Sequence, residues 1–154
     1  MGVKITSAAF ADSGMIPSKY TCDGINVSPP LAWQTEANGI KSFVLICDDP
    51  DAPAGDWVHW ILYDLPAASR EIKEDCNANR NLPDGALMGV NDFHKISYGG
   101  PCPPSGTHKY HFKIYALDKI LHLNAGATKR TILEAMKGHV VDHGLLVGKY
   151  KRTK

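Results

Sequence analysis

Prolines and glycines interrupt this chain at short intervals, and this punctuation constrains the fold more than any other feature of the sequence. Ten prolines and fourteen glycines are spread over 154 residues. Between them, apolar residues mostly recur at every second position, which is the periodicity of β-strands. We therefore predict one mainly β domain over residues 1–154, with two packed antiparallel sheets and one or two peripheral helices.

Three segments carry the strand pattern most clearly. Residues 41–47 are almost continuously apolar, as in a strand that is buried on both faces. Residues 57–65 alternate, and the side chains predicted to share one face are Trp57, His59, Ile61 and Tyr63. Residues 107–117 also alternate, which places His108 and Tyr110 on one face and His111 on the other.

One helix pattern occurs late in the chain. Thr128 can act as an N-cap, and an apolar stripe at helical spacing follows at Ile132, Leu133, Met136 and Val140. We predict a helix near residues 128–139 and a closing strand over residues 145–150. Residues 67–97 are polar and poor in apolar side chains, and short β segments such as ALMGV are expected to tie this excursion down.

Charge and hydropathy exclude several classes of protein. The chain has 17 basic and 16 acidic side chains and no run of five like charges, so it lacks the basic footprint of a nucleic-acid-binding protein. No apolar stretch approaches the roughly 20 residues that span a bilayer, and no signal peptide is visible. The expected location is the cytoplasm.

The four cysteines are far apart in the sequence. Cys22, Cys47, Cys76 and Cys102 form no C-x-x-C motif. Without an export signal we expect thiols rather than a disulfide framework, although any of the three pairings stays open.

Seven histidines raise the question of a metal site. His108 and His111 would point to opposite faces of their strand and cannot chelate one ion together. His139 and His143 have helical spacing, but a zincin motif needs glutamate directly after its first histidine, and that position is Val140. We expect ordinary histidines near a helix C-terminus, and we predict neither a metal nor another cofactor.

The segment DDPDAPAGDWVHW, residues 48–60, places acidic residues, prolines and a histidine between two apolar runs. Asp49, Asp51 and His59 are presented by a proline-stiffened loop and the strand that follows it. Two carboxylates and an imidazole can therefore converge beside an aromatic wall. The alternative is that the aspartates only cap turns, because Asp before Pro commonly opens a turn.

A second loop, YGGPCPPSG at residues 98–106, comes just before His108. Gly99 and Gly100 can adopt positive φ, so their N–H groups are candidates for an anion-binding nest. This position favours a binding loop over an ordinary turn. A hydrolytic set built on Ser105, His108 and an aspartate is the weaker alternative, because serine between proline and glycine is typical of turns.

DDPDAP, the VHW that follows it, and YGGPCPPSGTHKYHFKIYAL resemble the two signature regions of the phosphatidylethanolamine-binding protein family, also called the Raf kinase inhibitor protein family. The match is closest to the compact bacterial and archaeal branch and covers nearly the whole chain. The resemblance implies a two-sheet sandwich with a small surface pocket for phosphorylated or other anionic groups. Carried over residue by residue, the pocket comprises Asp49, Pro50, Asp51, Ala52, Pro53, His59, Gly99, Gly100, Pro103, His108 and Tyr110.

The chain departs from the eukaryotic members of that family at two places. They have two adjacent histidines where this chain has Val58 and His59, and they continue into a C-terminal helix near the pocket, whereas this chain stops at Lys154 after its last strand. We therefore do not carry over a lid of that kind or the kinase partners specific to those members.

The resemblance implies a non-enzymatic binding or regulatory protein for a phosphorylated or anionic ligand, with kinase or protease inhibition and a homodimer as further expectations. The alternative is an enzyme that uses His59 and His108 as acid and base. We expect the neighbouring aspartates to raise the pKa of both histidines, which would then donate to the anion as cations. A neutral aspartate would be a further donor, whereas an ionised aspartate would hold an ammonium group instead.

Overall fold

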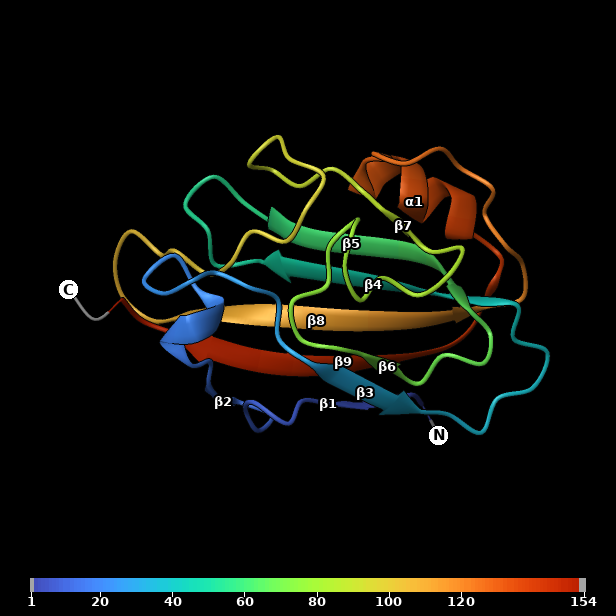
Figure 1. The fold of residues 1–154 in the computed structure, drawn as a ribbon, viewed down its shortest axis with the longest axis horizontal. Helices are drawn as coiled ribbons and strands as arrows, with labels where there is room; N and C mark the ends of the chain where they lie inside the picture. The colour runs from blue at the N-terminus through green and yellow to red at the C-terminus, as the bar shows by residue number, and fades with distance from the viewer. Residues whose placement is uncertain (1, 153–154) are drawn as a thin grey trace.

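The computed structural model describes residues 2–152, so Met1, Thr153 and Lys154 of the predicted domain lie outside the described residues. Within this range the strands form two sheets (Figure 1). The smaller sheet has the order β1 (Lys4–Thr6), β3 (Leu31–Gln34), β6 (Glu71–Ile72). The larger sheet has the order β2 (Gly14–Met15), β9 (Val140–Tyr150), β8 (His108–Leu117), β4 (Ser42–Asp49), β5 (Trp57–Pro66), β7 (Leu87–Met88).

This arrangement confirms the predicted mainly β architecture with two sheets. The strand pairs are antiparallel except for one, because β2 runs parallel to β9. The helices are the 3₁₀ turn η1 (Ser18–Tyr20) and α1 (Lys129–Met136). The ALMGV segment supplies β7, which pairs with β5 as expected for a short tie within the polar excursion.

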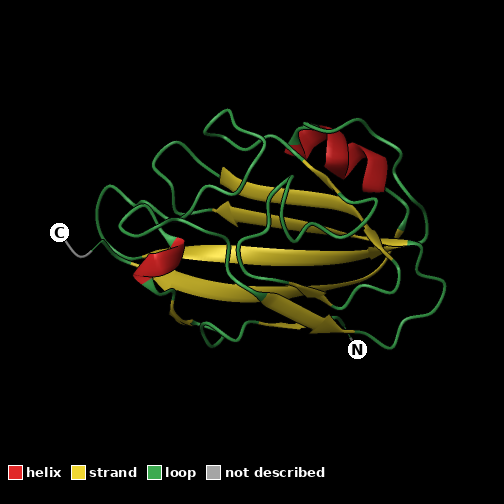
Figure 2. Ribbon diagram, viewed as in Figure 1, coloured by secondary structure: helices red, strands yellow, loops and turns green. Residues whose placement is uncertain are grey.

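β4 is the centre of the molecule. Every one of its residues is buried, as its continuous apolar pattern predicts. One face of β4 turns toward the smaller sheet, where Phe43 packs against Trp33 at 5.6 Å between ring centroids. The other face packs under α1, which contributes Ile132 and Met136 to that core. Figure 2 shows that long loops gather at the left-hand end of the sheets, opposite α1.

The helix begins where the sequence predicts it and ends earlier. Thr128 is the N-cap, and its side-chain oxygen accepts a hydrogen bond from the Thr131 N–H. The predicted apolar stripe is too wide, because Leu133 is 40% exposed and Val140 already belongs to β9. β9 extends along the whole of β8 and begins earlier than the predicted closing strand, so His143 lies on a strand and shares no helix face with His139.

The alternation predicted for β5 fails at His59. Cys47 pairs with Trp60 and Asp48 with Val58, which leaves His59 as an additional residue on β5. This is a β-bulge, in which two residues of one strand oppose one residue of its partner. The bulge shifts the phase of the strand, so Ile61 and Tyr63 face the α1 side and do not share the face of Trp57 and His59.

Candidate ligand-binding pocket

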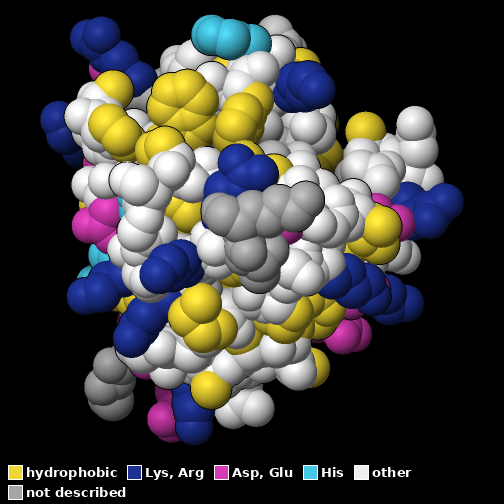
Figure 3. Space-filling view, turned by 90° about the vertical axis from the view of Figure 1, so that its left-hand side faces the viewer, with side chains coloured by type: hydrophobic (Ala, Val, Ile, Leu, Met, Phe, Trp, Pro, Cys, Tyr) yellow, Lys and Arg dark blue, Asp and Glu magenta, His cyan; other side chains and the backbone are white. Residues whose placement is uncertain are grey.

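A pocket of about 250 Å³ opens where the end of β4 meets the beginnings of β5 and β8. Its lining residues are Asp49, Ala52, Pro53, Ala54, Trp57, His59, Phe93, Cys102, Pro103, Pro104, His108 and Tyr110. Three strands and three loops supply them. Figure 3 views this end of the molecule and shows hydrophobic side chains gathered in its upper part, with Lys and Arg side chains around them.

The floor of the pocket contains a buried histidine–aspartate pair. His108 Nδ1 lies 2.7 Å from Asp49 Oδ2, and both side chains are at least nine-tenths buried. A carboxylate oxygen accepts, so this nitrogen carries the proton and Nε2 is left for a ligand. Asp49 Oδ1 accepts from the Asp51 N–H at 2.8 Å, which fixes the carboxylate plane. The pair thus orients the imidazole of His108.

His59 is held by a different partner. Its Nδ1 lies 2.6 Å from the carbonyl oxygen of Gly99, which can only accept, so Nδ1 donates and the neutral ring keeps Nε2 as an acceptor. Burial lowers the pKa of His59, and this desolvation outweighs the Gly99 hydrogen bond and the charge of Asp49, which both raise it. The expectation that neighbouring aspartates raise the pKa of this histidine is wrong, because its burial is the larger effect.

Tyr110 provides a polar group without a partner. The residue is 1% exposed, and no group among residues 2–152 forms a hydrogen bond with its hydroxyl. Burial raises the pKa of the phenol, as does the nearby Asp49 carboxylate, so the hydroxyl keeps its proton and remains a donor. Its ring meets His59 edge-on at 5.2 Å and stacks beside His108 at 6.4 Å. As predicted, His108 and Tyr110 share one face of β8.

The walls of the pocket are aromatic and proline-rich. Phe93 is 38% exposed and its ring meets both Trp57 and His59 edge-on, at centroid distances of 5.5 and 5.4 Å. Pro103 and Pro104 form another part of the wall. Such walls favour the carbon skeleton of a ligand, while the histidines and the tyrosine supply the few polar contacts that orient it.

The two glycines do not form the predicted nest. Neither residue has a positive φ, and both N–H groups are used internally. The Gly99 N–H donates to the His59 carbonyl oxygen at 2.9 Å, and the Gly100 N–H donates to Asn26 Oδ1 at 2.9 Å. A Cβ at Gly100 would lie 2.2 Å from Asn26 Oδ1 and 2.3 Å from the Tyr20 carbonyl oxygen. These glycines are required for close packing of two loops.

The sequence-predicted residues divide into two groups. Those that line the pocket are Asp49, Ala52, Pro53, His59, Pro103, His108 and Tyr110, and those outside the lining are Pro50, Asp51, Gly99 and Gly100. Asp51 supports the pocket from behind, because its carboxylate accepts from the Lys109 N–H at 2.9 Å and ties the loop to β8.

Sequence reasoning missed five lining residues. They are Ala54, Trp57, Phe93, Cys102 and Pro104. Trp57 was recognisable as an aromatic wall, and Cys102 and Pro104 lie within the second loop. Phe93 comes from the polar excursion and carried no signal of its own.

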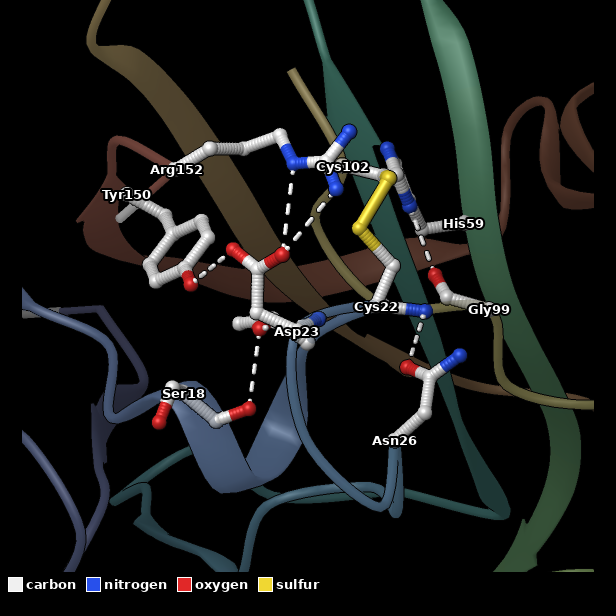
Figure 4. The surroundings of a disulfide bond; sticks show 11 residues. Ser18, Cys22, Asp23, Asn26, His59, Gly99, Cys102, Tyr150 and Arg152 are labelled. Atoms are coloured by element: carbon white, nitrogen blue, oxygen red, sulfur yellow. Dashed lines mark hydrogen bonds and ion pairs between the residues drawn. A yellow bond between two sulfur atoms is a disulfide. The ribbon is translucent and has the colours of Figure 1, made fainter. Parts of the chain in front are cut away.

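The expectation of free thiols is wrong for two cysteines. Cys22 and Cys102 form a disulfide across 80 residues of sequence, with their Cα atoms 5.4 Å apart (Figure 4). The physical reason is that the 98–107 loop folds back onto the segment after η1, a contact that no sequence spacing reveals. Cys47 and Cys76 are free and buried, and burial raises the pKa of Cys76 to about 12.

Two further features of the described chain concern metals and membranes. Within residues 2–152, no group of three His, Cys, Asp or Glu side chains is arranged to hold a metal ion. His139 instead contacts Asp118, with 2.8 Å between Nδ1 and Oδ1. None of the helices in this range has the length and hydropathy needed to cross a bilayer.

Comparisons with known proteins agree with this fold. The family model described as phosphatidylethanolamine-binding protein matches residues 6–151. A UPF0098 protein of Methanothermobacter thermautotrophicus is 49% identical over 97% of this chain and 99% of its own length. A UPF0098 protein of Aquifex aeolicus is 42% identical over 97% of this chain and 89% of its own length.

Two crystal structures share the fold over almost their whole length. CT736 of Chlamydia trachomatis, described as a phosphatidylethanolamine-binding protein homologue, superposes with a TM-score of 0.90 at 38% identity, covering 98% of both chains. YbcL of E. coli, described as a new member of the mammalian family, superposes with a TM-score of 0.92 at 27% identity, covering 99% of this chain and 100% of its own. The chain belongs to the phosphatidylethanolamine-binding protein family.

Proposed function

We propose that the pocket binds the phosphate-type head group of a small molecule or of a phosphorylated side chain, without turnover. The observation that carries this proposal is the Tyr110 hydroxyl, a buried donor with no partner among the described residues, beside the His108–Asp49 pair. A buried unsatisfied donor costs about 1 to 3 kcal/mol, and a ligand acceptor would recover that cost. An unpartnered buried donor is therefore expected where a ligand supplies the missing acceptor.

The polar groups of the pocket match a singly protonated phosphate monoester. The Tyr110 hydroxyl and, when the ring is protonated, His108 Nε2 supply donors for its unprotonated oxygens. His59 is neutral near pH 7 and offers Nε2 as an acceptor, which suits the one P–O–H of such a monoanion. The Tyr110 hydroxyl as a donor, His59 Nε2 as an acceptor and His108 Nε2 therefore face the ligand.

Asp49 contributes by orientation in this proposal. Both of its carboxylate oxygens already accept hydrogen bonds, from His108 and from the Asp51 N–H. Because both oxygens are already hydrogen-bonded, Asp49 is better suited to orient His108 than to contact a ligand ammonium group directly. The carbon part of the ligand would pack against Trp57, Phe93 and the prolines. Inhibition of a kinase or protease, a homodimer and a cytoplasmic location stay predictions.

The test is a calorimetric titration of O-phosphoethanolamine and of phenyl phosphate at pH 6. Tyr110→Phe removes only the hydroxyl, and losing a hydrogen bond to a charged group should weaken binding about ten- to a hundredfold. Because the hydroxyl has no partner in the free protein, Tyr110→Phe should unfold at the same or a higher temperature than the parent.

Tyr63→Phe is the matched control. Its hydroxyl donates to the Asn124 carbonyl oxygen outside the pocket, so this variant should lose stability and keep its affinity within about twofold. Failure of both phosphates to bind the parent protein, or equal affinity of Tyr110→Phe and the parent, would refute the proposal. Turnover of either phosphate ester would replace it with the enzyme alternative.

A further inference from the structure

The disulfide is part of the pocket wall. Cys102 lines the pocket, and both Cys22 and Cys102 line a second, adjoining hollow of about 230 Å³. The two hollows share only Phe93 and Cys102 among their lining residues. Both cysteines are half-buried, and they line a hollow that the proposed phosphate ligand does not occupy.

The disulfide joins a firmly held segment to a weakly held one. Residues 18–26 are anchored on the body of the protein, because the Tyr20 hydroxyl donates to Glu74 at 2.5 Å and the Asp23 carboxylate accepts from Tyr150 at 2.5 Å. Arg152 adds an ion pair with Asp23 at 3.1 Å (Figure 4). Cys22 lies within this anchored framework.

Residues 102–107, in contrast, form no hydrogen bond with any other residue that the structure describes. This segment carries Pro103 and Pro104, which form the pocket wall. It is fixed at one end by the disulfide and at the other by the start of β8. Just before it, the Cys22 N–H donates to the Pro101 carbonyl oxygen at 3.1 Å. Opening the disulfide removes the covalent cross-link between this wall and the 18–26 segment.

We infer that Cys22–Cys102 is a thiol–disulfide exchange site, at which a dithiol reductant opens the bond, loosens the 102–107 wall and weakens ligand binding. The part of this inference that concerns affinity rests on the proposed function. The part that concerns the exchange reaction and the wall does not.

The reaction balances with a dithiol. One thiolate of the reductant enters the second hollow and attacks the sulfur of Cys22 or Cys102, and the other cysteine leaves as a thiolate and takes a proton from water. The second thiol of the reductant, as a thiolate, then attacks the reductant sulfur of the mixed disulfide and displaces the remaining protein cysteine, which takes a proton from water. The reductant ends as a cyclic disulfide, and the protein holds two thiols. Lys95 lines this hollow, and its positive charge favours an approaching thiolate. Cys47 and Cys76 are buried and take no part.

Dithiothreitol under native conditions is the probe, and mass spectrometry follows the gain of two hydrogens. Two hydrogen bonds donated by backbone N–H groups join the chain just before the wall to residues 22–26, and their amides report its loosening by NMR hydrogen exchange: the Cys22 N–H, bonded to Pro101, and the Gly100 N–H, bonded to Asn26. Reduction should speed exchange at both by at least about tenfold, since exchange follows local opening. The Trp33 N–H, bonded to the Arg70 carbonyl oxygen in the smaller sheet, is the reference and should not change.

Affinity for O-phosphoethanolamine should fall at least about fivefold on reduction, because a preorganised wall is lost. Cys22→Ala/Cys102→Ala should match the reduced protein and ignore dithiothreitol, whereas Cys76→Ala should respond like the parent. If the double variant does not fold, reduced wild-type protein decides the question alone.

Three results overturn the inference: a bond that dithiothreitol opens only after unfolding, reporter amides that exchange at the same rate after full reduction, or an affinity that reduction leaves unchanged. If the oxidised protein binds no phosphate probe, the proposed function fails, and the mass and exchange measurements still decide whether the site exchanges and loosens the wall.

Discussion

Replacing Gly100 with alanine tests whether this glycine serves packing or anion binding. The new Cβ would lie 2.2 Å from Asn26 Oδ1 and 2.3 Å from the Tyr20 carbonyl oxygen, so the two loops must separate by about an ångström to restore normal contact. Overpacking of this kind costs about 1 to 3 kcal/mol, and the hydrogen bond from the Gly100 N–H to Asn26 adds about 1 kcal/mol. The expected loss is about 2 to 4 kcal/mol, or roughly 5 to 15 °C in melting temperature for a domain of this size.

Calorimetric or circular-dichroism melting measures this loss, and Gly106→Ala is the control. Gly106 lies in the same loop at φ +69°, and a Cβ added there would have no neighbour within 4 Å, so alanine meets only the cost of the left-handed backbone, about 1 kcal/mol. Equal melting temperatures for the two variants would refute the packing argument. A Gly100→Ala protein that keeps its stability and loses only anion affinity would restore the nest.

Two other predictions concern buried ionisable side chains. Because burial lowers the pKa of His59, the unfolded chain binds one proton more than the folded chain below about pH 6.5, so the stability from this group is full above that value and falls as pH drops toward the folded-state pKa. His59→Gln should reduce the slope of this fall by at most about 1.4 kcal/mol per pH unit, measured by urea titrations between pH 7.5 and 5. Identical slopes for the variant and the parent would contradict the argument. Lys129 Nζ lies 2.7 Å from Oδ2 of the fully buried Asp48, so Lys129→Ala should lower the free energy of unfolding by about 1 to 3 kcal/mol. The neighbouring variant Arg130→Ala breaks only an exposed ion pair with Glu134 and should lower it by less than about 0.5 kcal/mol. Indistinguishable unfolding free energies for these two variants would count against a structural role for the Asp48 contact.

Local regularity decided how much of the fold could be predicted. β4 and β8 are regular strands, so apolar continuity and alternation located them and correctly paired His108 with Tyr110 on one face. α1 carries its own N-cap signal at Thr128. β5 was predicted as a strand with the wrong phase, because a bulge depends on pairing with β4 and leaves no mark in the strand's own sequence.

The candidate pocket was predictable where its residues lie in the two motifs. The pKa shift of His59 was not predictable, because burial depends on tertiary packing and reverses the direction expected from the neighbouring aspartates. The disulfide and Phe93 come from segments that meet only after folding. The two glycines were singled out for the wrong reason, since the close approach of the Tyr20 carbonyl oxygen to Gly100 cannot be read from the YGG sequence.

The bulge in β5 also limits how this pocket can be transplanted. His59 and Trp60 are consecutive, and both turn toward the inter-sheet side, which a regular strand cannot arrange because neighbouring side chains alternate. Grafting the pocket side chains onto an unbulged sandwich would therefore place either the imidazole or the core tryptophan on the wrong side. A design must therefore reproduce the bulge, in which β5 has one residue more than β4, together with the pocket side chains. Deleting His59 would remove the imidazole and the bulge, while the side chains of the remaining strand would keep their faces.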